Sequence, residues 1–362
     1  MLPLAGLAAF FAYIYVFNVD IPEIITAVQN INLYYYSVAT VAVILDTLFF
    51  TLAWNTLLRF LSVRISIFKS FLFVWVGVFV DTLIPAESVS GEVTKIYLVN
   101  REQNGTTGQA TASVVAHRLI GLGLTLVTLL IGTVMLLVEG QLNRVVFQVN
   151  MTILQFTITM LVLILVIVAL IVFFLVLLML LCVKECWTLR IIDAIIRFAE
   201  RISRGRWKLV KLREEIVEAA RAFHGAMKEY AHAPKTLFVS ALLSAISLAF
   251  SLSVFYLTFL SIGYNQINWS AILIISMIFA AVKSIPIGIP FEVGLPEITL
   301  TFLLQLFGVP TVVGATATIL MRILTLWLRF FIGFAVEQWM GIRAITTGPS
   351  DIVNPPLQVE KA

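Results

Sequence analysis

The 362-residue chain is 60% hydrophobic and only 12% charged, with a formal net charge of +4 and a mean hydropathy of +1.03. This composition excludes a soluble domain with a charged surface, and no basic, aromatic-interleaved surface indicates nucleic-acid binding. We therefore expect an all-α polytopic membrane protein whose solvent is mostly lipid.

Six apolar runs are long enough to cross a bilayer, because a helix needs roughly 20 residues to span about 30 Å of hydrocarbon. Backbone polar groups in lipid must be paired within the segment, so unbroken runs indicate helices, whereas β-barrel strands would alternate over about ten residues. The expected crossings are residues 2–19, 33–58, 106–138, 151–183, 236–262 and 311–340. The first run lacks a basic region before it and a cleavage site after it, which favours a retained helix over a signal peptide.

Two shorter apolar segments break before they complete a crossing. Residues 67–84 and 271–285 run into Pro/Gly-rich stretches, and amphipathic helical patterns follow at 88–100 and 295–307. A helix that enters the membrane, breaks and returns is typical of secondary transporters. We therefore expect two re-entrant helical hairpins in addition to the six full crossings.

Basic residues decide the orientation, because Lys and Arg accumulate in cytoplasmic loops. The linker 184–235 carries twelve Lys and Arg against seven Asp and Glu, whereas 20–32 and 263–268 carry no Lys or Arg. This pattern predicts a cell-membrane protein with both termini in the cytoplasm and one hairpin entering from each side.

The linker also alternates apolar and basic positions at helical spacing. A basic amphipathic helix on the anionic leaflet would explain it, and so would a charged face in water. Residues 346–362 are expected to form a disordered tail. The two cysteines, Cys182 and Cys186, are too few for a disulfide framework and have no histidine partners for zinc.

The chain divides into two membrane repeats, residues 1–147 and 148–345. The first holds two helices, the hairpin 67–100 and the long helix 106–138. The second holds the linker, the hairpin 271–307 and a long helix of its own.

The spacing of charged residues supports this division. Glu92 precedes Arg118 by 26 residues, and Glu297 precedes Arg322 by 25. With the orientation above, each element of the second half crosses in the opposite sense to its counterpart. That is an inverted-topology repeat, and transporters with such repeats bind substrate near the membrane midplane.

The two breaks carry the residues on which chemistry would depend. They read P-A-E-S-V-S-G-E from Pro85 and P-I-G-I-P-F-E-V-G-L-P-E from Pro286. An ionised side chain at bilayer depth costs several kcal/mol unless it is paired or hydrated, so a cluster of them predicts a polar cavity. Freed N–H groups at helix ends favour an anion such as phosphate, which arginine binds bidentately. The candidate substrate-binding residues are Asp81, Pro85, Glu87, Gly91, Glu92, Lys95, His117, Arg118, Lys283, Pro286, Gly288, Pro290, Glu292, Gly294, Glu297 and Arg322.

Some of these residues also have a purely structural interpretation. Glu92 with Arg118, and Glu297 with Arg322, could each form an internal ion pair that holds a hairpin against its long helix. His117 could shuttle a proton, or it could be a helix–helix hydrogen-bond partner. Asp46 and Arg329 lie in long helices without obvious sequence neighbours, and their roles stay open. No metal motif, nucleotide-binding glycine loop or Ser/His/Asp arrangement is present, so we expect no metal, cofactor or catalytic residue.

The chain resembles the lysylphosphatidylglycerol synthetase transmembrane family, whose members are flippase-like integral membrane proteins. The resemblance rests on Pro85–Glu92, His117-Arg118, Pro286–Glu297 and the segment from Gly308 to Arg322. It spans nearly the whole chain.

Two departures from the family pattern concern the hairpins. The first hairpin usually has an Asn followed by P-G-R-x-G-[DE], whereas here Asp81 replaces the Asn and Glu87 replaces the Arg. The second usually reads P-G-G-x-G-x-x-E, of which Gly294 and Glu297 are kept. A usually basic first hairpin is therefore acidic.

The resemblance implies that the protein moves a polar-headed phospholipid or glycolipid between leaflets, with membrane lipids as its partners. The synthetic domain of the aminoacyl-phospholipid enzymes is not seen in this chain, so a transporter is favoured over an enzyme, and a separate glycosyltransferase or synthetase is an expected partner. Two alternatives stay open. One is a membrane-embedded enzyme or accessory factor in lipid-linked sugar or aminoacyl-lipid assembly, and the other is an ion or small-solute transporter, suggested by the many carboxylates.

Overall fold

The computed structural model describes residues 28–84, 89–140, 145–150, 155–202, 210–283 and 294–346, together with Pro22 and Thr26. The expected crossing at 2–19 lies outside these residues, as does the expected tail from residue 347 onward. Five helical segments within them are long and apolar enough to span a membrane. These are α3 (Leu33–Phe60), α6 (Thr107–Val138), α7 (Met160–Val183), α10 (Pro234–Ser261) and the continuous segment Thr311–Gly341. The chain is a multi-pass helical membrane protein.

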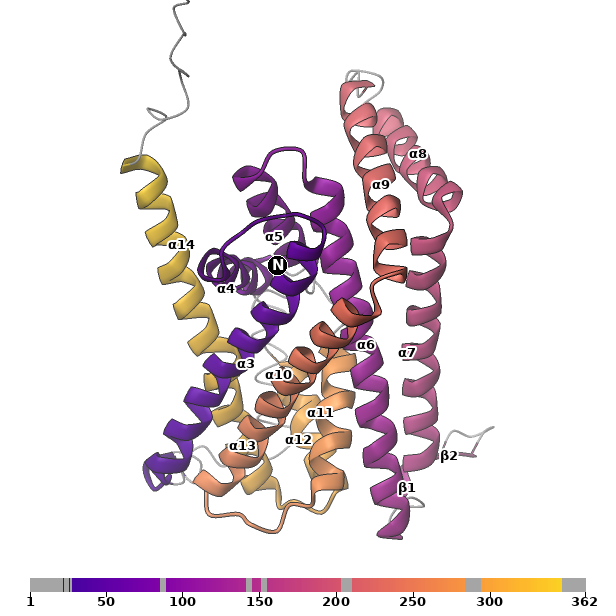
Figure 1. Cartoon of the computed structure of the whole chain (residues 1–362). Coiled ribbons are helices and arrows are strands. Elements are labelled where there is room, and N and C mark those ends of the chain that lie inside the picture. Colours follow the sequence, from indigo (N-terminus) through magenta and orange to yellow (C-terminus); the bar gives the residue numbers. More distant parts are fainter. Residues whose placement is uncertain are drawn as a thin grey trace, which may run out of the picture.

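The last of these segments is made of three parts. The helix α13 (Thr311–Arg322) continues into η2 (Ile323–Leu328), one stretch of wider π-helical turns, and then into α14 (Arg329–Thr346). Figure 1 shows the result as one long path from α13 at the bottom of the view to α14 at the upper left.

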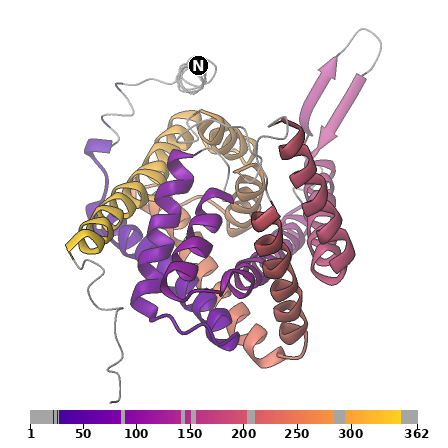
Figure 2. The same cartoon turned by 90° about the horizontal axis from the view of Figure 1, so that it is seen from above.

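The expected crossing at 151–183 is wrong in its first part, because helix α7 begins only at Met160. Residues before it form a two-stranded antiparallel hairpin of β1 (Val145–Asn150) and β2 (Gln155–Thr159). In β2, Gln, Thr and Thr alternate with Phe and Ile, which is the period of a strand and not of a helix. The side chain of Thr159 then caps α7 by accepting a hydrogen bond from the backbone N–H of Val162. Figure 2 shows this hairpin projecting away from the helices.

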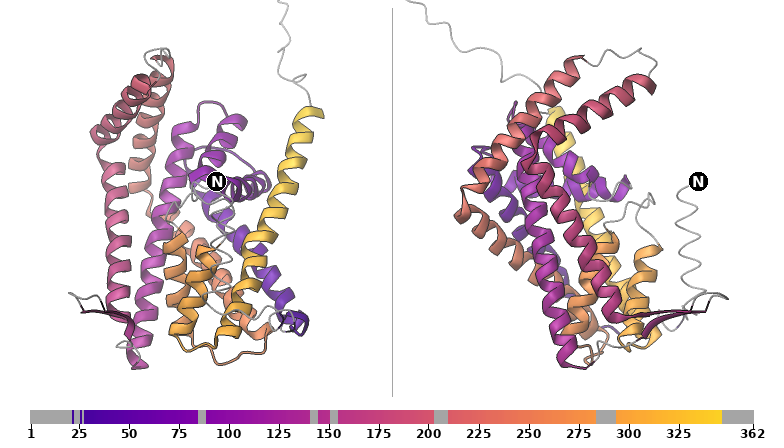
Figure 3. Two further views of the ribbon diagram at one scale, coloured as in Figure 1. Left: turned by 180° about the vertical axis from the view of Figure 1, so that it is seen from behind. Right: turned by 90° about the vertical axis from the view of Figure 1, so that its right-hand side faces the viewer.

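Four shorter helices occupy the positions of the two expected hairpins. The first pair is α4 (Ile67–Leu83) and α5 (Val89–Glu102), and the second is α11 (Trp269–Lys283) and α12 (Leu295–Leu306). The members of each pair pack against each other. Figures 1 and 3 show α4 and α5 in the upper half of the molecule, and α11 and α12 in the lower half.

The central crossing is made by α3 and α10, which pack on each other more extensively than any other two elements. Each has 28 residues, and their first residues, Leu33 and Pro234, are 201 positions apart. Serines of α10 hold them together: Ser240 donates to the backbone oxygen of Ala53 at 3.1 Å, and Ser247 donates to the Asp46 carboxylate at 2.5 Å. Small hydroxyl residues of this kind allow close approach of membrane helices.

Two glycines, also 201 positions apart, make a second matching pair of contacts. Gly132 of α6 packs against α11, and a Cβ built on it would lie 2.9 Å from a side-chain carbon of Ile274. Gly333 of α14 packs against α4, and its Cβ would lie 2.5 Å from the backbone oxygen of Trp75. Each long helix therefore holds the first short helix of the other half.

The basic linker folds as two helices. It forms α8 (Glu185–Ile202) and α9 (Val210–Ala231), which pack together and extend past the ends of the membrane helices. The apolar face of α9 packs on α6, where a Cβ on Gly108 would lie 2.5 Å from that of Ala222. Protein covers this face, because Phe223, Ala226 and Tyr230 of α9 are buried in one hydrophobic cluster with residues of α6.

Substituting the two packing glycines should destabilise the protein. We expect Gly132→Ala and Gly333→Ala each to lower the free energy of unfolding by about 1–3 kcal/mol, because the added methyl group has no space. The matched controls are Gly121→Ala on α6 and Gly341→Ala on α14, where a Cβ meets nothing within 4 Å. Unfolding in detergent measures all four, and equal losses in the two sets would contradict the close packing.

Candidate functional site

The first candidate residues hold the hairpin α4–α5 together. Asp81, near the end of α4, accepts hydrogen bonds from the Ser90 hydroxyl at 2.7 Å and from the Gly91 backbone N–H at 2.6 Å. A carboxylate at a helix N-terminus pairs the free N–H groups there and opposes the helix dipole. Gly91 leaves no space for a side chain, since a Cβ would lie 2.4 Å from the backbone oxygen of Gly77. Asp81 and Gly91 therefore set the approach of the two helices.

Lys95, one turn further along α5, is buried between aromatic rings. Its ammonium lies 5.3 Å from the ring centres of both Phe50 and Trp54 of α3. Such cation–π contacts stabilise a desolvated cation. The charged groups that act on it are Glu92 and Asp81, which attract it, and Arg118, which repels it.

Arg118 of α6 and Glu92 of α5 form a loose ion pair at the edge of this cluster. The distance between Arg118 Nη1 and Glu92 Oε1 is 3.4 Å, and the two side chains are 37% and 27% exposed. At 3.4 Å the contact is longer than a usual charge-assisted hydrogen bond of about 2.7–2.9 Å, so the pair is weak. The Arg118 guanidinium therefore keeps capacity for another anion.

His117, the neighbour of Arg118, faces α10. It is buried, its Nε2 lies 3.2 Å from the Ser244 hydroxyl of α10, and its ring meets that of Phe50 edge-on. These contacts are those of a helix–helix hydrogen-bond partner.

The second charged cluster, at the start of α12, is more deeply buried than the Glu92–Arg118 pair. Glu297 of α12 accepts from Arg322 Nε at 2.6 Å and from the Gly294 backbone N–H at 2.7 Å. The side chains of Arg322 and Glu297 are only 5% and 7% exposed. Gly294 has a φ of +104°, a conformation that favours glycine, and it lets Glu297 reach back to cap its own helix.

A third ionic cluster joins two residues whose roles the sequence left open. Asp46 of α3 pairs with Arg329, which begins α14, and also accepts from Ser247 of α10. They are 283 positions apart, so nothing in local spacing indicated the pair. A signal was nevertheless present: a charge within a membrane helix requires a partner, and these two were the charges left without one.

Two paired arginines, one buried and one half-buried, stand at the two ends of the π-helical stretch. Arg322 precedes η2 and pairs with α12, whereas Arg329 follows η2 and pairs with α3. In a regular α-helix, residues seven positions apart lie on almost the same face. The wider turns of η2 change this relation and direct the two side chains to different helices. π-helical turns occur frequently at functional sites.

The remaining predicted site residues are not placed. Lys283 ends α11, and its side chain is not described. Pro85 and Glu87 in the first break lie outside the described residues, as do Pro286, Gly288, Pro290 and Glu292 in the second. Among the side chains that are described, no three His, Cys, Asp or Glu groups come together in a way that could hold a metal ion.

Comparison with known proteins identifies relatives over most of the chain. A family model described as the lysylphosphatidylglycerol synthase TM region matches residues 3–333. A UPF0104 membrane protein of Pyrococcus horikoshii is 23% identical over 293 residues, which are 80% of this chain and 82% of that protein.

Removal of one carboxylate should show the difference between the two Glu–Arg pairs. We expect Glu297→Gln to cost about 3–5 kcal/mol of unfolding free energy, because it leaves a buried guanidinium without its counter-charge. Glu92→Gln should cost about 1 kcal/mol or less, since that pair is longer and more exposed. Chemical unfolding in detergent compares the two variants. Similar losses of unfolding free energy would contradict the conclusion that one pair is buried and tight and the other loose.

A double-mutant cycle should reveal the third pair. We expect Asp46→Asn and Arg329→Gln to be coupled by about 0.5–3 kcal/mol, because each substitution removes the same contact. The same unfolding measurement on both single variants and the double variant gives the coupling. Additive losses would show that the two residues act independently.

Proposed function

Because the chain belongs to the lysylphosphatidylglycerol synthase TM region family, we propose that it moves a polar-headed phospholipid or glycolipid between the leaflets of the bilayer. The head group crosses through the protein while the apolar tails stay in lipid. Membrane lipids are its substrates, and a separate glycosyltransferase or synthetase supplies or uses them.

The open Arg118–Glu92 pair is the observation that carries this proposal. A guanidinium that is 37% exposed and only loosely paired can bind a phosphate by releasing Glu92, and arginine does so with two parallel hydrogen bonds. Lys95 lies buried close to this pair, with its amine over two aromatic rings. Glu92 keeps the guanidinium paired between substrates, which lowers the cost of holding it in the membrane.

The closed pair serves a different role in the same proposal. Glu297 and Arg322 are each bound on several sides within a nearly dry environment, so they hold the second hairpin in place. The residues of the two breaks complete the head-group site, and these are Pro85, Glu87, Lys283, Pro286, Gly288, Pro290 and Glu292.

We further propose that the two halves, residues 1–147 and 148–345, form an inverted-topology repeat with one re-entrant hairpin each. Three correspondences support this: the equal lengths of α3 and α10, their separation of 201 positions, and the same separation between the packing glycines Gly132 and Gly333. The crossing of α3 and α10 then lies on the symmetry axis, and rocking about it would expose the site to either side. The α8–α9 linker marks the cytoplasmic side of the cell membrane, where both termini also lie.

Lipid translocation in reconstituted vesicles tests the function. Fluorescent lipid in the outer leaflet is quenched with a membrane-impermeant reductant, and protein-dependent exchange is followed over time. We expect Arg118→Gln to slow exchange about 10- to 100-fold, the effect of losing one charge-assisted hydrogen bond to phosphate. The matched control is Lys69→Gln, which breaks an exposed ion pair with Glu102 on the same hairpin and should leave the rate unchanged.

Two results would decide against the proposal. Wild-type protein that exchanges no phospholipid or glycolipid faster than empty vesicles would exclude a flippase. A lipid product formed by the protein in detergent, and lost in Glu92→Gln, would instead show an enzyme, since no sidedness exists there.

A further inference from the structure

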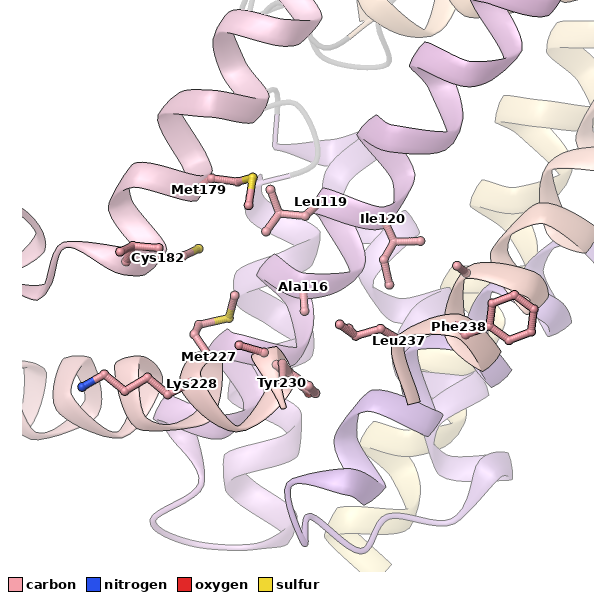
Figure 4. A pocket seen from close by; sticks show the side chains of 13 residues that line it. Ala116, Leu119, Ile120, Met179, Cys182, Met227, Lys228, Tyr230, Leu237 and Phe238 are labelled. Atoms are coloured by element: carbon pink, nitrogen blue, oxygen red, sulfur yellow. The ribbon is translucent and has the colours of Figure 1, made fainter. Parts of the chain in front are cut away.

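We propose a second lipid site, separate from the head-group site: the cavity between α6, α7, α9 and the start of α10 binds one acyl chain of an anionic phospholipid, whose phosphate lies at Lys228. The cavity has a volume of about 620 Å³, within the range of about 300–1,000 Å³ that is usual for small-molecule sites. Figure 4 shows the side chains of the four helices around it.

The cavity lies where the membrane helices meet the linker. Its walls come from the last turns of α7, the C-terminal part of α9, the first turns of α10 and the N-terminal half of α6. Two of these helices, α6 and α7, are membrane spans, so the cavity borders the part of the protein that lies in lipid. Arg118 does not share this space, because it is about 200° around α6 from Ala116, which lines the cavity.

The lining selects an apolar occupant. Met179, Met227, Leu119 and Leu237 line it, and methionine side chains adapt their shape to an irregular ligand. The tyrosine hydroxyl in its wall is already bound inside the protein. The Tyr230 hydroxyl donates to the backbone oxygen of Leu57 at 2.9 Å.

A single formal charge lies at the rim. Lys228 is the one Lys, Arg, Asp or Glu among the described residues that line the cavity, and it is exposed. In Figure 4 its stem lies beside the apolar side chains and its amine points away from them. An apolar chamber with one cation at its edge complements an acyl chain that ends in an anionic head group.

Occupation of the cavity would join the linker to the membrane domain. The bound acyl chain would contact α6, α7 and α9 at once, and these three helices also contact one another directly. A ligand that binds only the folded arrangement raises its stability by mass action. The bound lipid is therefore a structural lipid that braces α9 against the bundle, and not the transported one.

Lipid retention by the full-length protein in detergent, measured by native mass spectrometry, tests the site. Wild-type protein is titrated with phosphatidylglycerol and with phosphatidylcholine of the same chains, and we expect one phosphatidylglycerol to be retained preferentially. Ala241→Phe should lower its retention at least tenfold by filling the cavity. The matched control is Ala249→Phe on the same helix, at an exposed position outside the lining. Equal retention by the two variants would overturn the site.

The head-group assignment has its own comparison. We expect Lys228→Gln to reduce the preference for phosphatidylglycerol over phosphatidylcholine about fivefold, the effect of one lysine at an anionic membrane surface. Lys235→Gln, an exposed lysine outside the lining, should leave the preference unchanged. Equal retention of both lipids by wild-type protein would overturn the role of Lys228.

A measurement on the unaltered chain makes the result independent of variant folding. Phosphatidylglycerol with a photoreactive group near the end of one acyl chain is crosslinked in vesicles, and the adducts are mapped by peptide sequencing. We expect adducts at Leu119, Met179 or Met227. Adducts spread over the outer faces of the helices, with none at these residues, would overturn the proposal.

Discussion

An ionised side chain surrounded by hydrocarbon must have a partner, because no water is present to solvate it and an isolated charge costs several kcal/mol. Three ionic contacts between different helices meet this requirement: Glu92 with Arg118, Glu297 with Arg322 and Asp46 with Arg329. Each joins a different pair of helices. The arrangement of the short helices against the long ones follows from where these charges can be satisfied.

The ion pairs differ in length and in exposure, and this difference distinguishes a structural pair from one that could bind a ligand. Glu297–Arg322 is almost fully buried and has extra hydrogen bonds, so opening it would leave two uncompensated charges. Glu92–Arg118 is longer and partly exposed, so exchange of one anion for another costs little there. In the proposed function, the second pair therefore holds its hairpin in place while the first is available to a ligand.

Close backbone contact is the second requirement, and glycine and serine meet it. Gly91, Gly132 and Gly333 stand where a methyl group would meet backbone or side-chain atoms at 2.9 Å or less, and serines of α10 hydrogen-bond directly to α3. The hydrophobic effect does not drive helices together within lipid, so such contacts have to do so. The π-helical stretch η2 also contributes to helix association, because it lets one continuous helix present its two arginines to two different partner helices.

The sequence by itself determined that this is a helical membrane protein and, apart from the start of α7, the positions of the long crossings among the described residues. The spacing of its charged residues indicated that two Glu–Arg pairs could form. Hydrophobic length and the spacing of charged residues are local properties, and they act before any tertiary contact forms. Only the tertiary structure decided that Asp46 meets Arg329 across 283 positions, that Asp81 caps α5, and that α9 packs on α6. The start of α7 at Met160 depended on β2 pairing with β1. These features depend on which distant helix or strand lies opposite a given residue, and the three-dimensional packing alone fixes that.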